Sequence, residues 1–176
     1  MKSAVIYSSK TGFTQKYAEW ISQELGADLF PMDKFDRSMI DNYDTIIYGG
    51  GLYAAGINGI RFIKINFSRL RSKKLIIFAS GSTPWRENAV NKVKNKNFTP
   101  EEQAHLKFFY LRGGLNMTKM GMFDRFLMKL LRASILSKGK KRELTPDEKG
   151  MLAAMDNPVD FTSKDNIKDL VAYARE

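Results

Sequence analysis

The chain has 176 residues, of which 43% are hydrophobic, and it carries a formal net charge of +10. Its length is sufficient for one domain with a substantial core, and its 12 Phe, 7 Tyr and 2 Trp exclude a disordered chain. With no cysteine and a single histidine, His105, the sequence argues against a disulfide framework, a thiol nucleophile, a metal site and a serine–histidine triad. Redox chemistry in this chain would therefore require a bound organic cofactor.

Neither a signal peptide nor a membrane-spanning segment is recognisable in the sequence. No apolar run approaches the roughly 20 residues that span a bilayer. The N-terminus contains Lys2 but no extended apolar region with a cleavage site of small residues. We therefore expect neither a membrane-spanning helix nor a signal peptide.

Apolar strands and amphipathic helices alternate along the chain. Strands are predicted at residues 2–8, 27–32, 43–49, 74–80 and 106–111. Helices are predicted at residues 13–25, at residues 57–70, and from Ser163 to the C-terminus. Because the strands are continuously apolar, the pattern is typical of a parallel sheet covered by helices on both faces. The expected fold is a doubly wound α/β sheet of five parallel strands in the order 2-1-3-4-5.

Two stretches have the composition of helix starts. Thr99 and Thr145 are each followed by a proline and two acidic residues, a pattern that caps a helix N-terminus. The second stretch predicts an additional helix within residues 145–157. Residues 86–103 are otherwise polar and rich in lysine, and they carry no recognisable binding motif.

The most informative loop connects the first strand to the first helix. It consists of Ser9, Lys10, Thr11, Gly12, Phe13 and Thr14. A helix N-terminus offers unsatisfied N–H groups and a partial positive charge, to which the hydroxyl groups add further donors. Gly12 lets the backbone approach an anion closely. The loop therefore predicts a phosphate cradle, and the alternative is a turn that only caps the helix. It is neither a nucleotide P-loop nor a dinucleotide fingerprint, because the required earlier glycines are absent.

Two further strand ends have compositions suited to ligand binding. The third strand is followed by Gly50, Gly51, Leu52 and Tyr53, and the fourth strand by Ser80, Gly81, Ser82 and Trp85. In a doubly wound sheet, ligands bind outside the carboxyl ends of the strands. We therefore expect all three loops to converge on one edge of the sheet. His105 precedes the fifth strand and is expected to be structural.

The positive charge is concentrated in one late segment. Residues 112–142 contain nine Lys and Arg residues and one acid, Asp124. From Gly121, the apolar residues follow one face of a predicted helix: Phe123, Phe126, Leu127, Leu130, Leu131 and Ile135. This helix either docks on an anionic membrane surface through residues 121–142 or packs in the core with solvated lysines. Nucleic acid is not expected as a partner, because neither a recognition motif nor an aromatic platform accompanies the charge.

The spacing Ser-x-Thr-Gly-x-Thr in residues 9–14 resembles the phosphate loop of the flavodoxins, which hold flavin mononucleotide (FMN). The resemblance implies that the hydroxyl residues and the glycine of this loop hold the phosphate. It implies that a glycine peptide in residues 49–51 hydrogen-bonds the flavin N5, and that backbone N–H groups in residues 80–85 bond the pyrimidine edge. It also implies that Tyr53 and Trp85 frame the flavin ring. Alternatively, Tyr53 is a surface residue and Trp85 is an ordinary packing anchor.

Over nearly the whole chain, the sequence is similar to the flavodoxin-like, quinone-dependent protoporphyrinogen oxidases of bacteria. The similarity lies in the phosphate loop, in residues 112–115 and 159–162, and above all in Met-Phe-Asp-Arg-Phe-Leu-Met-Lys-Leu at residues 122–130. It implies an FMN-dependent oxidoreductase that passes electrons from an organic substrate, a porphyrinogen, through FMN to a quinone. The alternatives are a flavodoxin-type electron carrier without its own substrate and a family member that has lost its flavin.

These expectations combine into one organisation. We expect residues 1–176 to form a single flavodoxin-like FMN-binding domain, in which residues 116–157 are a basic helical insertion before the last helix. Residues 137–142 are expected to be a linker within that insertion. The expected location is the cytoplasm, with docking on the inner face of the cell membrane. No side chain of the sequence emerges as a catalytic acid or base, although Arg112, Lys119 and Arg125 are candidates to bind substrate propionates.

Overall fold

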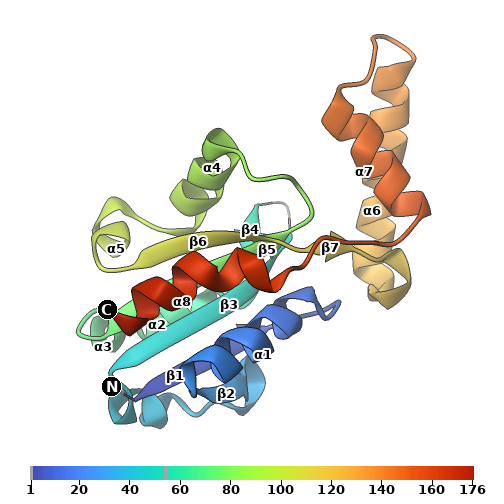
Figure 1. The fold of residues 1–176 in the computed structure, drawn as a ribbon. Coiled ribbons are helices and arrows are strands. Elements are labelled where there is room, and N and C mark those ends of the chain that lie inside the picture. The colour runs from blue at the N-terminus through green and yellow to red at the C-terminus, as the bar shows by residue number, and fades with distance from the viewer. Residues whose placement is uncertain (1, 54) are drawn as a thin grey trace.

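A computed structural model describes residues 2–53 and 55–176. Its centre is a parallel sheet in the order β2-β1-β3-β5-β6 (Figure 1). The strands are β1 (Ser3–Ser8), β2 (Asp28–Pro31), β3 (Thr45–Tyr53), β5 (Lys74–Gly81) and β6 (Lys107–Arg112). Counting the parallel strands alone, this is the predicted order 2-1-3-4-5. The predicted fold class is therefore confirmed.

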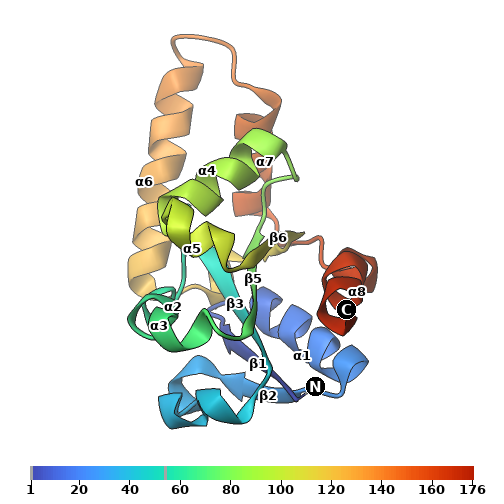
Figure 2. The same ribbon diagram turned by 90° about the vertical axis from the view of Figure 1, so that its left-hand side faces the viewer.

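Helices cover both faces of this sheet (Figure 2). On one face, α1 (Phe13–Leu25) and α8 (Lys168–Arg175) pack against β1, β3 and β5. The other face is covered by α2 (Arg61–Ile65), α3 (Phe67–Leu70) and α4 (Glu87–Asn97). The α5 helix (Pro100–Ala104) follows α4 and starts at the predicted cap, Thr99. Short 3-10 helices lie at Met32–Lys34, Arg37–Asn42, Met117–Lys119 and Lys164–Ile167.

The prediction of one helix over residues 57–70 is wrong. Ile57 lies in β4 (Gly56–Ile57), a short strand antiparallel to the end of β3, and Asn66 separates α2 from α3. The side chain of Asn66 donates to the carbonyl of Phe62, which stabilises the break. The apolar spacing looked helical because Ile57, Ile63 and Leu70 all pack on one core cluster although they belong to three different elements.

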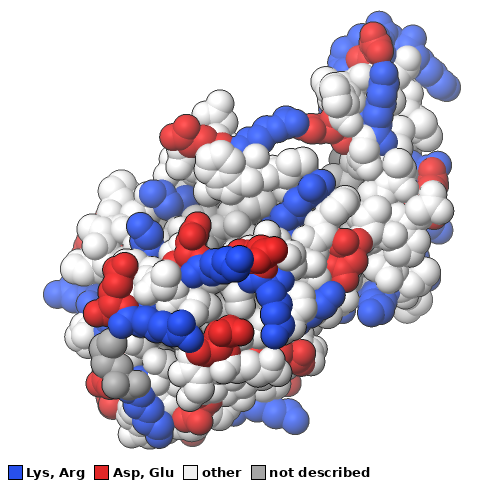
Figure 3. Space-filling view, viewed as in Figure 1, with Lys and Arg blue, Asp and Glu red and all other residues white. Residues whose placement is uncertain are grey.

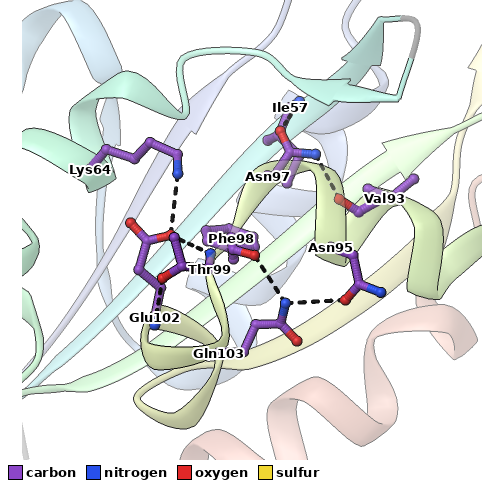
Figure 4. A network of polar contacts seen from close by, with 9 residues as sticks. All are labelled: Ile57, Lys64, Val93, Asn95, Asn97, Phe98, Thr99, Glu102 and Gln103. Carbon is purple, nitrogen blue, oxygen red and sulfur yellow. Dashed lines mark hydrogen bonds and ion pairs between the residues drawn. The ribbon is translucent and has the colours of Figure 1, made fainter.

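The α4 helix is absent from the sequence prediction, and a buried amide attaches it to β4 (Figure 4). Asn97 is buried, and its side-chain oxygen accepts a hydrogen bond from the backbone N–H of Ile57 at 2.9 Å. Its amide nitrogen donates to the carbonyls of Val93 and Ala55.

At α5, Glu102 closes the capping box with Thr99 and pairs with Lys64. This network holds α4 and α5 against the part of the chain that follows β3.

The basic segment forms a helical arm that projects from the sheet (Figures 1 and 2). The arm consists of α6 (Met122–Gly139) and α7 (Pro146–Asp156). A two-stranded ribbon of β7 (Gly114–Leu115) and β8 (Val159–Asp160) connects it to the body. Methionine and leucine side chains form a small core cluster where the two helices meet the ribbon. The predicted linker at residues 137–142 is wrong in part, because α6 continues through Gly139.

The alternative of a core-packed α6 is also wrong. Ile135 is buried, but Met122 is 88% exposed and Phe123 is 73% exposed. The remaining apolar residues of the predicted stripe, Phe126, Leu127, Leu130 and Leu131, are exposed as well. Figure 3 shows Lys and Arg side chains gathered at the tip of the arm. The arm therefore presents both apolar and basic side chains outside the main core.

Glycine substitutions distinguish the core of the sheet from the arm. An added Cβ at Gly49 in β3 would lie 2.0 Å from the ring of Phe78, whereas one at Gly150 in α7 meets nothing within 4 Å. We expect Gly49→Ala to lower the free energy of unfolding by about 1–3 kcal/mol through overpacking. Gly150→Ala should leave it unchanged or raise it by up to about 1 kcal/mol, because alanine favours a helix. Urea unfolding followed by circular dichroism measures both, and equal destabilisation would contradict this packing.

Candidate functional site

A cavity of about 850 Å³ opens at the carboxyl ends of the parallel strands. Its floor is formed by the loop before α1 and by the ends of β3 and β5, and its walls are formed by α4 and the arm. Figure 3 shows the molecular surface hollowed between the body and the arm. Sites for small molecules and cofactors usually have volumes of roughly 300–1,000 Å³. The cavity is therefore large enough for a cofactor and lies where doubly wound sheets bind ligands.

The start of α1 is open toward an anion. Gly12, at the N-cap, has a φ of 93°, a left-handed conformation that favours glycine. Its backbone N–H donates to Ser9 Oγ at 3.1 Å, which closes the loop on itself. No side chain caps the helix, and its first turn contains no acidic residue. The first-turn N–H groups therefore have no carboxylate competing for them, as an anion site at a helix N-terminus requires.

A buried hydrogen bond joins two of the three predicted loops. Thr14, in the first turn of α1, has its Oγ1 2.7 Å from Oγ of Ser80, at the end of β5. Both residues are buried. Gly51 completes the group, because a Cβ added there would lie 3.3 Å from Thr14 Oγ1. The three loops thus meet at Thr14. The residues that approach it, Ser80 and Gly51, are small, as the close contact requires.

Lys10, Tyr53 and Asp124 connect the loop to the arm. The ammonium group of Lys10 lies 4.4 Å from the centre of the Tyr53 ring and 2.7 Å from Oδ2 of Asp124, in the first turn of α6. Burial, with a smaller contribution from the negative charge of Asp124, raises the pKa of Tyr53 to about 12. Tyr53 therefore stays a neutral phenol and forms an aromatic wall of the cavity.

Most of the predicted site residues line this cavity. They are Lys10, Thr11, Phe13, Thr14, Gly51, Leu52, Tyr53, Ser80, Gly81 and Ser82. Four others lie outside the lining. Ser9 and Gly12 close the loop through the hydrogen bond from Gly12 N–H to Ser9 Oγ, and Gly50 is packed against Ile57. Trp85 is 63% exposed and lies outside the wall, although Thr83 and Pro84 belong to it.

The residues predicted to bind substrate propionates do not lie at the cavity. Arg112 stacks on Phe161, with its guanidinium carbon 3.7 Å from the ring centre. Arg125 donates to the carbonyls of Thr118 and Met120. Neither arginine nor Lys119 belongs to the cavity lining. His105 ends α5 and contacts the ring of Phe67, in agreement with the expectation of a structural role.

A second set of cavity residues was missed by sequence reasoning. It comprises Ala89, Val90, Lys92 and Val93 of α4, Phe123, Asp124, Leu127, Met128 and Leu131 of α6, and Met151 of α7. The sequence predicts the apolar stripe of α6 and gives lipid or the core as its environment, whereas the structure places part of it on the cavity wall. Arg86, at the start of α4, forms an ion pair with Asp147 of α7 and so links the two walls.

Sheet order, an open helix start and a ligand-sized cavity at the topological switch point define a doubly wound α/β protein with a candidate ligand site at the usual edge of the sheet. Comparison with protein families agrees with this description. The chain belongs to the family of the Flavodoxin domain, whose family model matches residues 4–143.

The relatives of the chain differ in how much is known of them. An uncharacterized protein of Methanocaldococcus jannaschii is 30% identical over 128 residues, which cover 66% of this chain and 85% of that protein. Protoporphyrinogen IX dehydrogenase (quinone) of Escherichia coli is 22% identical over 147 residues, which cover 74% of this chain and 78% of the enzyme. Among solved structures, oxidised flavodoxin 2 from Bacillus cereus aligns with 18% identity and a TM-score of 0.46, covering 64% of this chain and 84% of that one.

The contact between α6 and the loop can be tested by titrating Tyr53. We expect its phenol to titrate near pH 12 rather than near 10, and Asp124→Asn to lower this pKa by removing a nearby negative charge. Folding raises the pKa of the Tyr53 phenol above 10. Its contribution to the free energy of unfolding is therefore fully present below pH 10 and is lost as the pH rises from 10 to 12. NMR titration of 13C-labelled tyrosine gives the value, with Asp160→Asn as a control. An unchanged Tyr53 pKa in Asp124→Asn would contradict the contact.

Proposed function

We propose that this protein is an FMN-dependent oxidoreductase that passes electrons from an organic substrate to a quinone. The name of its E. coli relative gives protoporphyrinogen IX and a quinone for that enzyme. The observation that carries the proposal is the cavity of about 850 Å³ that joins an uncapped helix N-terminus to aromatic and apolar walls. FMN has the same polarity, with a phosphate at one end and an aromatic ring system at the other.

The residues present fit FMN. The phosphate would be held by the first-turn N–H groups of α1 and the hydroxyl of Thr11, with Gly12 permitting the close approach. The ring system would lie between Tyr53 and the backbone of residues 80–83. When bound, FMN supplies hydride and electron transfer, chemistry that no side chain of the chain offers.

The chain itself would hold and shield the cofactor. The Thr14–Ser80 hydrogen bond keeps the phosphate loop and the end of β5 at a constant separation. Lys10 places a positive charge at the loop, where Asp124 orients it. Leu52, Tyr53 and the α4 wall exclude water from the ring, which strengthens the electrostatic interactions inside the site. These are binding and positioning roles, and we assign no side chain as acid or base.

An enzyme is favoured over a simple electron carrier by the space around the proposed ring site. The cavity continues from the three loops to the apolar side chains of α4, α6 and α7, so that a substrate has room beside the cofactor. A flavodoxin-type carrier needs only an exposed edge of the flavin. Carriers also commonly dock through acidic surfaces, whereas this chain has a net charge of +10.

The outer face of α6 would bring this site to an anionic membrane surface. Met122 and Phe126 are exposed next to Arg125 and Lys129, so apolar insertion and attraction to headgroups act on the same face. Within residues 2–53 and 55–176, none of the helices combines the length and the apolar character that a membrane span requires. The proposed attachment is therefore peripheral.

Two glycines at opposite ends of α1 test FMN binding. Gly12 and Gly26 both have positive φ, and an added Cβ meets nothing within 4 Å at either position. Alanine should therefore strain the backbone at both, but only Gly12 lies at the proposed phosphate site. We expect Gly12→Ala to weaken FMN binding about tenfold or more, equivalent to roughly 1.4 kcal/mol, and Gly26→Ala to change it less than about twofold. Quenching of FMN fluorescence on titration measures both affinities.

The same FMN-loaded protein separates the functions. Anaerobic reduction of the bound FMN shows whether the cofactor is redox-active. In a separate assay, protoporphyrinogen as electron donor and a menaquinone analogue as acceptor should give turnover for an enzyme. FMN binding without turnover would support the carrier. If the wild-type protein forms no FMN complex, both redox functions are wrong.

Vesicle flotation tests the membrane surface. Phe126→Glu should abolish co-flotation with vesicles that contain anionic lipid, because it places a charge at the apolar face of α6. Ile65→Glu changes an apolar residue on α2 that is more exposed than Phe126, 68% against 56%, and should float like the wild type. Binding should fall in high salt and with neutral lipid. Flotation that is indifferent to lipid charge and to Phe126→Glu would refute the proposal.

A further inference from the structure

The cavity contains a negative charge that is carried by the arm. Among the lining residues that the structure describes, Asp124 is the one acid, and it belongs to the first turn of α6. Its side chain is 12% exposed, and its Oδ2 accepts a hydrogen bond from the ammonium group of Lys10 at 2.7 Å. A carboxylate of the arm therefore reaches the loop that precedes α1.

Lys10 is held from two sides. Its ammonium group contacts the carboxylate of Asp124 and lies 4.4 Å from the centre of the Tyr53 ring. Lys10 and its neighbour Thr11 both line the cavity, so this positive charge belongs to the proposed phosphate site. The first turn of α1 itself contains no acidic residue. The negative charge that faces this loop thus comes from the arm rather than from α1.

A phosphate monoester at the start of α1 would compete with Asp124 for Lys10. Such a group carries between one and two negative charges near pH 7. Lys10 has a single positive charge and cannot neutralise both partners. Repulsion between the phosphate and the carboxylate is only partly screened, because Asp124 is largely shielded from solvent. Asp124 orients Lys10 until a phosphate becomes its partner, and it opposes that exchange.

The competition extends to the attachment of the arm. Beside the β7–β8 ribbon and the apolar cluster, the ion pairs Lys10–Asp124 and Arg86–Asp147 join the arm helices to the body. The first of these ion pairs lies at the phosphate loop, whereas neither member of the second lines the cavity. A coupling free energy acts equally in both directions, so a phosphate that weakens the Lys10–Asp124 pair is itself bound less tightly because of it.

We propose that Asp124 is a specificity-determining residue that competes with a ligand phosphate for Lys10. Phosphate binding at residues 9–14 and attachment of the first turn of α6 therefore oppose each other. Asp124 lowers the affinity for a phosphorylated flavin and leaves that for a flavin without phosphate unchanged. The inference rests on the proposed function only for the identity of the ligand, because any phosphate monoester at this loop meets the same competition.

Two aspartates of the arm test the proposal on the full chain. Asp124→Asn removes the charge from the cavity, and Asp147→Asn removes the other ion pair between an arm helix and the body without changing the lining. We expect FMN to bind about threefold to tenfold more tightly to Asp124→Asn than to the wild type. Its affinity for Asp147→Asn should stay within about twofold of the wild type. Quenching of flavin fluorescence measures both.

Riboflavin, which has the same ring without the phosphate, separates charge from packing. Its affinity should change less than about twofold in both variants, because it does not compete for Lys10. FMN affinity that is equal or lower in Asp124→Asn would overturn the proposal. An equal gain for riboflavin and FMN, or for the two variants, would also overturn it, since either result would indicate a looser arm rather than competition.

A second measurement uses inorganic phosphate and does not require FMN. In 15N NMR spectra of the wild-type protein, phosphate should shift the backbone amide signal of Asp124 and leave that of Asp147 unchanged. Sodium chloride at equal ionic strength should shift neither signal. Lys10→Met, which keeps a long side chain without the charge, should abolish the response of Asp124. An Asp124 signal that is indifferent to phosphate would overturn the proposal.

The two proposals fail in different ways. A phosphate response of Asp124 in a protein that binds no FMN would refute the proposed function and leave the competition intact. FMN binding with equal affinity in the wild type and Asp124→Asn would refute the competition and leave the proposed function intact.

Discussion

The site is organised around the buried hydrogen bond between Thr14 and Ser80. It joins the first turn of α1 to the end of β5, two segments that are separated by the central strand β3. A buried hydroxyl must have a partner, so the bond favours one relative position of these segments. Gly51 lies close to the same hydroxyl and leaves it the necessary room. The open start of α1 and the cavity above it both depend on this arrangement.

The arm adds a second layer to that site. It is attached by the β7–β8 ribbon and a small cluster of apolar residues, and ion pairs of Lys10 and Arg86 connect its helices to the body. Partly exposed ion pairs contribute little stability each, so the arm is held mainly by the ribbon and its apolar cluster. One face of α6 closes the cavity and another remains on the surface. In the proposed function, these two faces would serve the cofactor site and the membrane attachment through different residues.

Much of the site could be predicted, because its residues belong to continuous segments. The loop at residues 9–14 and both glycine-containing strand ends are local patterns, and parallel strands bring their carboxyl ends to one edge. The α4 wall could not be predicted. Its helix has few apolar residues, and its position depends on the amide of Asn97, whose partners lie about 40 positions earlier in the chain. Trp85 is exposed and lies outside the cavity lining, so its contact with the cofactor stays a prediction.

The alternation of strands and helices, the parallel sheet and the loop at residues 9–14 could be read from local sequence patterns. These features follow from local periodicity and from the conformational freedom of glycine. The environment of α6 could not, because it depends on tertiary contacts. An amphipathic stripe is compatible with core, lipid or a cavity wall, and the choice depends on which distant elements face it. Here the ribbon that carries the arm sets Phe123, Leu127 and Leu131 on the wall of the cavity, more than 100 positions along the chain from the loop at residues 9–14 that forms its floor.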